Sequence, residues 1–316
     1  MTIATLNNNT PIFIVGAARS GTTLLQYMLR SHPDISLPTA ESHFFIPFFK
    51  KSADFGDLTQ LENTQRLLEE IYKSRQSFFD DDVHGIKFNA KELAQVFQQK
   101  KLSTVPQIIS GIFEENAQAE GKKRWGDKTP YYILHLDTIL EMYPNAQIIH
   151  LIRDGRDCAL SMLERKWDLQ IFNTYHAAYT WDRYVTAGKV FGAKHPASYY
   201  EIRYEDILDQ PEASIQKLCD FLNIEFNESV INFKKSGNSG KTALLTKPLQ
   251  KNNQEKWKNK MTHKQLSIFE SLAGNTLKDC GYELTYSAPA ISKWDWFVNE
   301  LHIKLCHFYC KHLLKK

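Results

Sequence analysis

One segment, residues 16–23 (GAARSGTT), constrains the fold of this 316-residue chain more than any other feature. It follows a short apolar run at residues 11–15, which predicts a buried strand, and it leads into TTLLQYMLR, where apolar residues recur at helical spacing. A glycine-flanked loop between a strand and a helix directs backbone N–H groups and the positive end of the helix dipole toward one point. The segment therefore predicts a binding site for a phosphate or sulfate group.

The loop departs from the pattern of ATP-binding loops at the position that decides the chemistry. Those loops carry lysine before the final Ser or Thr, to reach the β- and γ-phosphates, and this chain has Thr22 there. The cation lies inside the loop instead, at Arg19. A P-loop kinase of a small metabolite is therefore the weaker alternative, and a glycine turn with one solvated arginine is the plain structural one. The predicted anion-binding residues of the loop are Ala18, Arg19, Ser20, Gly21, Thr22 and Thr23.

Strands and helices are predicted to alternate along the chain. Apolar runs and helical periodicity predict further strands at residues 147–152 and 198–204, and helices at 130–143, 172–194, 211–222 and 262–281. The last of these helices begins with a possible capping box, Thr262 with Gln265. Such alternation is typical of the α/β class, and we expect a P-loop-like parallel sheet flanked by helices.

Length and composition bound the organisation of the chain. With 42% hydrophobic and 24% charged residues the composition is globular, and 316 residues suit one large domain. We expect a disordered lead at residues 1–10, a single domain at 11–285 that includes a long surface loop at 234–256, and an amphipathic helical extension at 286–316. We expect the extension to pack on the core of the protein, with peripheral membrane or partner contact as the alternatives.

Charge and cysteine content exclude several classes of protein. A net charge of +3 is too small for a dedicated nucleic-acid binder. Five scattered cysteines, an odd number, predict reduced thiols rather than a disulfide framework. The chain shows neither a signal-peptide pattern nor a run of about 18 apolar residues, so we expect a cytoplasmic protein. No HExxH or paired CxxC motif is present, and we expect no metal.

A second motif, residues 148–162 (IIHLIRDGRDCALSM), repeats the strand-to-helix pattern, with Arg153 at the strand end and Ser161 in the helix. Arginine gives charge-assisted hydrogen bonds to phosphate oxygens, and serine adds a directional donor; a solvated charged turn is the alternative. Together with RSGTT after the first strand, the segment resembles the donor-binding motifs of sulfotransferases that use 3′-phosphoadenosine 5′-phosphosulfate (PAPS), most closely the group of protein-tyrosine and related bacterial enzymes. The resemblance implies that Arg153 and Ser161 hold the 3′-phosphate of this donor.

The resemblance covers nearly the whole chain and implies further donor contacts. Tyr204 in EIRYEDIL is similar to a strand-ending tyrosine near the nucleotide, and EKWKNK is similar to a terminal segment that closes over the donor. The closing candidates are Lys256, Trp257 and Lys260, and the spacing does not choose between the two lysines. An ordinary solvated basic surface is the alternative for this segment.

The resemblance also implies catalytic residues. Glu41 in TAESHFF matches a general base, and Lys128 in WGDKTP matches a lysine that stabilises the sulfate and the bridging oxygen, a task that Arg19 shares. A surface carboxylate and a solvated lysine are the structural alternatives. His43 stands where the tyrosyl-protein branch has an arginine that helps to bind acidic peptide, which puts a tyrosyl-protein acceptor in doubt. Its ordinary pKa of about 6.5 also makes His43 the alternative base.

The implied reaction is the in-line transfer of a sulfuryl group from PAPS to a hydroxyl or amine. Lysine and arginine can replace the Mg²⁺ of kinases here, because a sulfuryl group carries less negative charge than a phosphoryl group. The acceptor is a small molecule, glycan, lipid or peptide, and aromatic residues within 44–79 and 167–184 suggest one with an apolar ring, unless they form core. The alternative from another class is a non-catalytic nucleotide- or glycan-binding module on the same fold.

Overall fold

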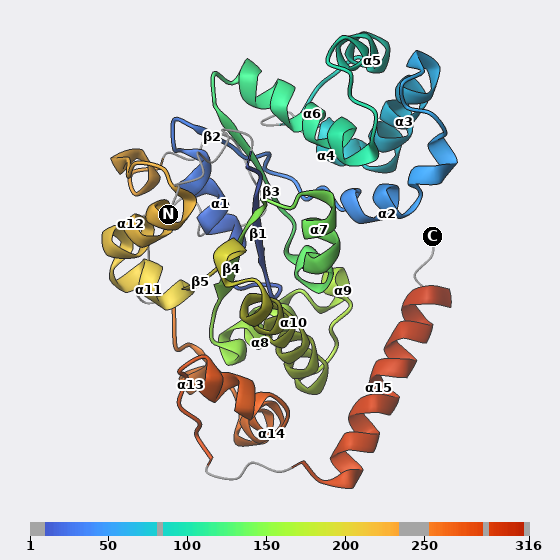
Figure 1. The fold of residues 1–316 in the computed structure, drawn as a ribbon. Helices are drawn as coiled ribbons and strands as arrows, with labels where there is room; N and C mark the ends of the chain where they lie inside the picture. The colour runs from blue at the N-terminus through green and yellow to red at the C-terminus, as the bar shows by residue number, and fades with distance from the viewer. Residues whose placement is uncertain (1–9, 81–84, 234–252, 287–290, 313–316) are drawn as a thin grey trace.

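A parallel sheet forms the centre of the computed structural model, which describes residues 10–80, 85–233, 253–286 and 291–312. In the described part its strands follow the order β2-β3-β1-β4-β5, and every pair is parallel (Figure 1). The strands are β1 (Ile12–Gly16), β2 (Ile35–Ser36), β3 (Arg124–Lys128), β4 (Gln147–Ile152) and β5 (Tyr199–Arg203). The predicted α/β fold with a parallel sheet is therefore confirmed.

Helices connect the strands and surround the sheet (Figure 1). Those in the first half of the chain are α1 (Thr22–Arg30), α2 (Phe45–Lys50), α3 (Leu61–Ser74), α4 (Gln76–Phe79), α5 (Ala90–Gln99), α6 (Val105–Ala119) and α7 (Leu136–Met142). Those in the second half are α8 (Gly155–Glu164), α9 (Lys166–Leu169), α10 (Thr174–Lys194), α11 (Tyr204–Asp209), α12 (Pro211–Leu222), α13 (Trp257–Lys260), α14 (His263–Asp279) and α15 (Lys293–His312).

Strand β1 is buried on both faces of the sheet. Alternate side chains of a strand point to opposite faces. Phe13 and Val15 join an apolar cluster with residues of α2, α3, α6 and α7, while Ile12 and Ile14 join another with residues of α1, α11 and α12. The sheet therefore separates two apolar cores, as expected for a parallel sheet with helices on both faces.

Most predicted elements are found with small shifts at their ends, and two departures have identifiable causes. The predicted capping box of α14 is present, with the Thr262 side chain accepting from the Gln265 N–H at 3.2 Å. A single helix over residues 130–143 is wrong, because a 3₁₀ turn (Pro130–His135) precedes α7 and the non-helical backbone of His135 separates the two. Strands β2 and β3 and helices α2 to α6 were not predicted. Residues 1–9 of the expected lead and 234–252 of the expected loop lie outside the described residues.

The C-terminal helix α15 is present, but its expected packing on the core is wrong. No residue of α15 is buried, and the helix runs along the outside of the molecule, away from the sheet (Figure 1). Its contacts with the body are polar at Asn173, whose side-chain amide donates to the Asn299 carbonyl at 3.3 Å and lies 3.2 Å from His302 Nδ1. The proposed boundary of the extension at residue 286 stays a prediction.

All five cysteines are free, as the expectation of reduced thiols requires. Cys158, Cys219 and Cys280 are buried, and Cys306 and Cys310 are partly exposed. Within residues 10–80, 85–233, 253–286 and 291–312, no helix combines the length and the apolar content needed to cross a bilayer.

Gly155, at the start of α8, provides a test of the packing between α8, α10 and α14. A Cβ atom at this position would lie 2.5 Å from the Trp181 ring and 2.6 Å from the Phe269 ring. Because both rings are buried, we expect Gly155→Ala to lower the free energy of unfolding by about 1–3 kcal/mol in chemical denaturation. The matched control is Gly274→Ala in α14, where the added Cβ meets only the end of the Leu284 side chain at 3.3 Å. Equal stability of the two variants would contradict the described packing.

Candidate active site

The predicted site residues meet at one edge of the sheet. The loop of residues 18–23 follows β1, Lys128 ends β3, Arg153 follows β4, and Tyr204 follows β5. Strand β1 lies between β3 and β4, where the connections leave in opposite directions. In open parallel sheets ligands bind at the carboxyl ends of the strands beside such a reversal. The sheet therefore collects residues from four separate parts of the chain at the place where a ligand is expected.

The loop after β1 has a tightly constrained backbone. Arg19 has φ 69° and Gly21 has φ 97°, both in the left-handed region. A Cβ atom on Gly21 would lie 2.5 Å from Cδ2 of Tyr204, so only glycine fits between the loop and this ring. Thr22 then begins α1, whose first N–H groups face the loop end of the helix. The loop thus has the form of an anion cradle in contact with the start of α11.

The four residues assigned to the two ends of the donor are joined by direct contacts. Arg19 Nε donates to Ser161 Oγ at 2.9 Å, and Arg153 Nη1 donates to the Arg19 carbonyl at 3.4 Å. The Arg153 guanidinium also lies over the Tyr204 ring, 4.5 Å from its centroid. The structure therefore brings together Arg19, Ser161, Arg153 and Tyr204, which the sequence separates by up to 185 positions.

Positive charge at this edge is only partly balanced. Burial lowers the pKa of the Arg19 guanidinium, and the nearby charges of Arg165 and Arg153 lower it further. Arg153 is 7% exposed, reaches the Asp157 carboxylate only at 3.5 Å, and has a buried Nε without a hydrogen-bond partner in the described residues. A bound anion would relieve both the repulsion and the missing hydrogen bond.

Asn253 completes this cluster and was missed by the sequence analysis. Its side-chain amide donates to the Tyr204 hydroxyl at 2.6 Å, and its carbonyl accepts from Arg153 Nη2 at 2.8 Å. Nothing in the sequence singled out this residue, because it lies in the polar stretch expected to be a surface loop. Its contacts bring the segment before α13 against Arg153 and Tyr204.

Trp257 lies against the turn that carries Arg153, and neither candidate lysine has a contact there that identifies it. The Trp257 ring is buried, with its centroid 3.6 Å from the Arg156 guanidinium, and the backbone N–H of Trp257 donates to the Asp157 carboxylate at 3.0 Å. Lys256 is half-buried and Lys260 is exposed, and neither forms a salt bridge with another described residue. The lysine that contacts the donor therefore stays an open prediction.

Arg156 anchors α8 and was also missed. It is 2% exposed and forms ion pairs with Asp154 and Glu270, both at 2.8 Å. Because Glu270 belongs to α14, this pair of ion pairs joins α14 to the turn that carries Arg153. The only sequence feature that indicated a role for Arg156 was the repeated charge of RDGRD, and this pattern is equally typical of a solvated turn.

Three of the four residues considered for catalysis form one polar cluster, whereas the fourth, Arg19, donates to Ser161. Lys128 Nζ donates to Glu41 Oε1 at 2.8 Å, and His43 Nε2 lies 3.1 Å from Glu41 Oε2. The Lys128 side chain is 4% exposed, whereas the Glu41 side chain is 38% exposed and faces solvent. Register pairs Lys128 with Ile14, two residues before Gly16, which places the cluster next to the base of the loop. Both candidate bases therefore share one hydrogen-bonded unit.

The electrostatics of this cluster keep Glu41 ionised. Burial raises the pKa of the Glu41 carboxyl, but the hydrogen bond with His43 and the charge of Lys128 outweigh burial and lower it to about 2. At neutral pH the group is a carboxylate, the form that can accept a proton. Its basicity is nevertheless low as long as Lys128 remains its ion-pair partner.

Asp127, next to Lys128 in β3, is a buried carboxyl group that the sequence analysis did not consider. It is 1% exposed, and neither of its oxygens has a hydrogen-bond partner in the described residues. Burial raises the pKa of Asp127 to about 6, despite the nearby Ser42 and Thr129 hydroxyls and the Lys128 charge, which lower it.

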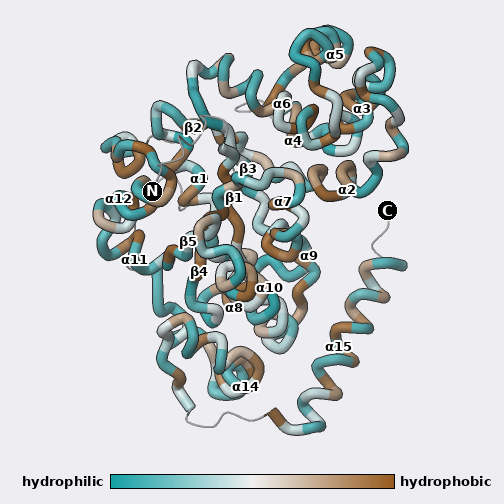
Figure 2. The backbone as a smooth tube through the Cα atoms, viewed as in Figure 1, coloured by the Kyte–Doolittle hydropathy of each residue, from teal (hydrophilic) through white to brown (hydrophobic). Residues whose placement is uncertain are grey.

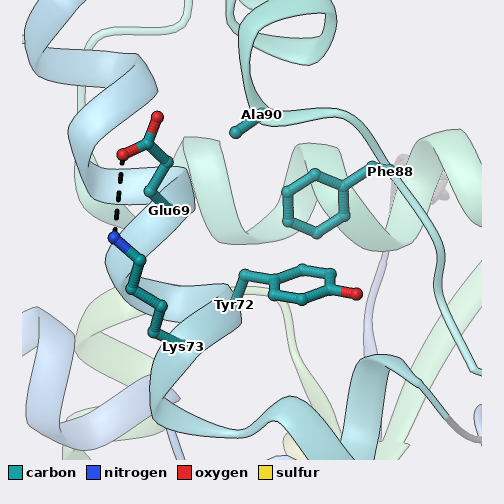
Figure 3. Close-up of a pocket in the computed structure, with 5 residues that line it drawn as sticks. All are labelled: Glu69, Tyr72, Lys73, Phe88 and Ala90. Atoms are coloured by element: carbon teal, nitrogen blue, oxygen red, sulfur yellow. Dashed lines mark ion pairs between the residues drawn. The ribbon is translucent and has the colours of Figure 1, made fainter.

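The predicted aromatic acceptor pocket is only partly present as a surface. Phe44 and Phe45 are buried in the core, so packing explains them, whereas Trp167 is 50% exposed. A cavity of about 190 Å³ lies between α3 and the start of α5 and is lined by Glu69, Tyr72, Lys73, Phe88 and Ala90 (Figure 3). Tyr72 belongs to the segment 44–79 that was predicted to line the acceptor, but none of the five is a predicted catalytic or donor-binding residue.

No metal centre is visible in the described stretches of the chain, where no three His, Cys, Asp or Glu residues are grouped to hold an ion. On α15, Cys306 Sγ lies 3.6 Å from His302 Nε2.

Comparison with known proteins identifies the family. The model of the sulfotransferase family matches residues 11–228. The chain belongs to the sulfotransferase family. The sequence-based resemblance to PAPS-dependent sulfotransferases is thereby confirmed, and the family match covers the loop, Glu41, Lys128, Arg153, Ser161 and Tyr204.

Individual relatives agree with this assignment. The chain is 27% identical over 223 residues to a putative protein-tyrosine sulfotransferase of Caenorhabditis briggsae, covering 70% of this chain and 68% of that one. It is 25% identical to protein-tyrosine sulfotransferase 1 of Danio rerio, over 70% of this chain but only 55% of that one. The sulfotransferase domain of the Synechococcus PCC 7002 olefin synthase has the same fold, with a TM-score of 0.57, 21% identity and coverage of 88% and 96% of the two chains.

The buried Asp127 predicts a pH dependence of stability. Its pKa is raised from 3.8 to about 6, so the folded state holds this proton more tightly than the unfolded chain does. The free energy of unfolding therefore falls as pH rises from about 4 to above 6, by roughly 2 kcal/mol. Asp127→Asn should remove this loss. Relative to the wild type, the free energy of unfolding of the variant should therefore be higher above pH 6 than it is below pH 4. Denaturant unfolding at both pH values measures the difference, and a pH-independent difference would contradict it.

Proposed function

We propose that this chain transfers a sulfuryl group from PAPS to a hydroxyl or amine of an acceptor, with Glu41 as the general base. The observation that carries the proposal is the convergence of the loop after β1, Arg153 and the Lys128–Glu41 pair at one edge of the sheet. A donor with phosphate groups at two ends matches a site with two groups of cations. An acceptor approaching from the exposed side of Glu41 would meet the base before the donor.

The donor is assigned from the charge distribution. Arg19 and the N–H groups at the start of α1 would hold the 5′-phosphosulfate, and Arg153 with Ser161 would hold the 3′-phosphate. The Arg19–Ser161 hydrogen bond supports a single ligand spanning both positions, because it joins the two groups of residues directly. Thr22, in place of the P-loop lysine, disfavours a kinase that uses ATP.

The proposed reaction uses positioned charges. In the donor, one oxygen bridges sulfur and phosphorus. Lys128 and Arg19 would stabilise the negative charge that develops on this oxygen as its bond to sulfur breaks. Glu41 would accept the acceptor proton while the acceptor oxygen or nitrogen bonds to sulfur. His43, hydrogen-bonded to Glu41, would hold this carboxylate in place, and in the alternative assignment it is the base itself.

The acceptor class is kept broad. Two relatives are named protein-tyrosine sulfotransferases, so a tyrosine hydroxyl is one acceptor to test. His43 stands where that branch has an arginine for acidic peptide, which favours testing small molecules, glycans and lipids alongside it. Incubation of extracts with the enzyme and donor, followed by a search for the mass of one added SO₃ group, identifies the acceptor without prior choice.

Donor binding is tested by thermal stability. At a concentration of about 100 times its Kd, adenosine 3′,5′-bisphosphate should raise the melting temperature by about 5 °C, because it binds only the folded state. ATP with Mg²⁺ should raise it much less. Arg153→Ala and Ser161→Ala should reduce the bisphosphate shift, and Arg66→Ala, an arginine on α3 away from the site, should retain it. Equal shifts of the melting temperature with ATP and with the bisphosphate would favour the alternative function, a P-loop kinase.

The base is tested by substitution. We expect Glu41→Gln to lower kcat about 10²–10⁴-fold, because the amide cannot take the acceptor proton, while the bisphosphate shift stays near that of the wild type. Transfer is measured with ³⁵S-labelled donor on whichever acceptor the mass search returns, and Glu70→Gln, at an exposed position of α3, is the matched control.

The same assay separates the remaining alternatives. Retained turnover in Glu41→Gln together with its loss in His43→Gln would assign the base to His43. Bisphosphate binding without transfer to any acceptor would favour the non-catalytic binding module, which keeps the fold and the donor site only.

A further inference from the structure

Helix α15 presents an unusual surface, because its exposed side is its apolar side. Figure 2 shows apolar positions recurring along the helix, which lies at the edge of the molecule. Three of the most exposed large side chains of the described residues are on it: Trp294 at 71%, Phe308 at 60% and Leu305 at 59%. A helix that packs on its own protein normally turns these positions inward. This surface is therefore not accounted for by the fold.

Seven of the eight large exposed apolar residues of α15 form one continuous row, and the eighth, Trp296, lies on the other side of the helix. A helix turns by about 100° per residue, which places seven of them within a sector about 120° wide. These seven are Trp294, Phe297, Val298, Leu301, Leu305, Phe308 and Tyr309, and we refer to them as the apolar row. The row continues onto α9, where Trp167 is 50% exposed and its ring lies 6.1 Å from the Tyr309 ring.

The opposite side of α15 faces the body of the protein through polar contacts and through the His307 ring, which lies 5.2 Å from the Phe172 ring and 5.8 Å from the His176 ring. Asp295 pairs with Lys264 of α14 at 2.7 Å, and Asn299 and His302 contact Asn173. Glu300 lies close enough to Tyr175 of α10 to raise the pKa of that phenol, after the effect of burial. The body thus holds both acidic residues of the helix and leaves the apolar row outward.

Lysines line one edge of the apolar row. At about 100° per residue, Lys293, Lys304 and Lys311 fall within about 20° of one another, beside the Phe297 end of the sector. All three are exposed. On α9, Lys166 lies 5.5 Å from the Trp167 ring. Among the described residues of α15, no acidic side chain lies in the row itself, and Glu300, which falls about 20° beyond Lys293, interacts with Tyr175 of the body.

This pattern fits an anionic lipid surface better than a second copy of the chain. A second copy would cover the apolar row, but it would also bring its own lysines to the edge of the row. These lysines would have no acidic partners, because the acidic residues of each helix face their own protein body. A bilayer with anionic headgroups covers the apolar row and neutralises the lysines together. Trp294, Trp167 and Tyr309 are the residue types that favour the boundary between headgroups and acyl chains.

We propose that α15, with Trp167 of α9, docks this protein on an anionic membrane surface. The helix lies flat, the apolar row enters the boundary between headgroups and acyl chains, and Lys293, Lys304 and Lys311 contact anionic headgroups. This surface is formed without the donor site, so the proposal is independent of the proposed reaction.

The test is co-sedimentation of the full chain with vesicles. Phosphatidylcholine vesicles that contain phosphatidylglycerol should bind the protein, pure phosphatidylcholine vesicles should bind it much less, and raised salt should weaken binding. Leu305→Asp should weaken binding about tenfold or more, because it places a charge in the middle of the apolar row. Lys304→Glu should weaken it at least about fivefold on the anionic vesicles only.

Matched controls keep the result interpretable. Val190→Asp places the same charge on an exposed apolar residue of α10, away from the apolar row, and should bind as the wild type does. Melting temperatures within a few degrees for all variants show that the fold is retained. Binding that Leu305→Asp leaves unchanged, or equal binding to both kinds of vesicle, overturns the proposal. So does a dimer in solution that Leu305→Asp dissociates while the wild type binds no vesicles.

Discussion

The parallel pairing of β3, β1 and β4 is the constraint on which the candidate site depends. Strand β3 ends at Lys128, β1 leads into the loop of residues 18–23, and β4 leads into Arg153. Only parallel strands place all three carboxyl ends at the same edge of the sheet. The close fit of Gly21 against the Tyr204 ring then fixes the loop relative to the end of β5. A change in the register of one strand would separate charges that are more than 100 residues apart in sequence.

The site is assembled with an excess of positive charge, which favours an anionic ligand over any neutral one. Arg153 Nη1 reaches the Arg19 carbonyl at 3.4 Å, and the Asp157 carboxylate reaches Arg153 only at 3.5 Å. Buried like charges destabilise the folded state unless an opposite charge arrives. In the proposed function the donor supplies that charge, so donor affinity and the stability of this part of the fold are coupled.

How much the sequence could predict depended on where each residue finds its partners. The strand, loop and helix around residues 12–30 were predictable, because local apolar periodicity and glycine placement determine them. Strand β3 was not, because RWGDK carries three charged residues and looks like a solvated turn. Arg124 is buried only because carbonyls of Thr10 and Leu222 accept its hydrogen bonds, and these lie about 100 residues away. For α15 the spacing of the apolar residues predicted a helix, but this spacing does not determine which face of the helix packs against the protein.

The Lys128–Glu41 ion pair links the two halves of the proposed reaction. While the pair is intact, the pKa of Glu41 is held near 2, too low for an effective base at neutral pH. In the proposed complex the sulfate group would share the charge of Lys128, which weakens the pair and raises the basicity of Glu41. Glu41 would then gain base strength only when the donor is in place. The same interaction that holds Lys128 in an almost fully buried position would thereby make proton removal depend on donor binding.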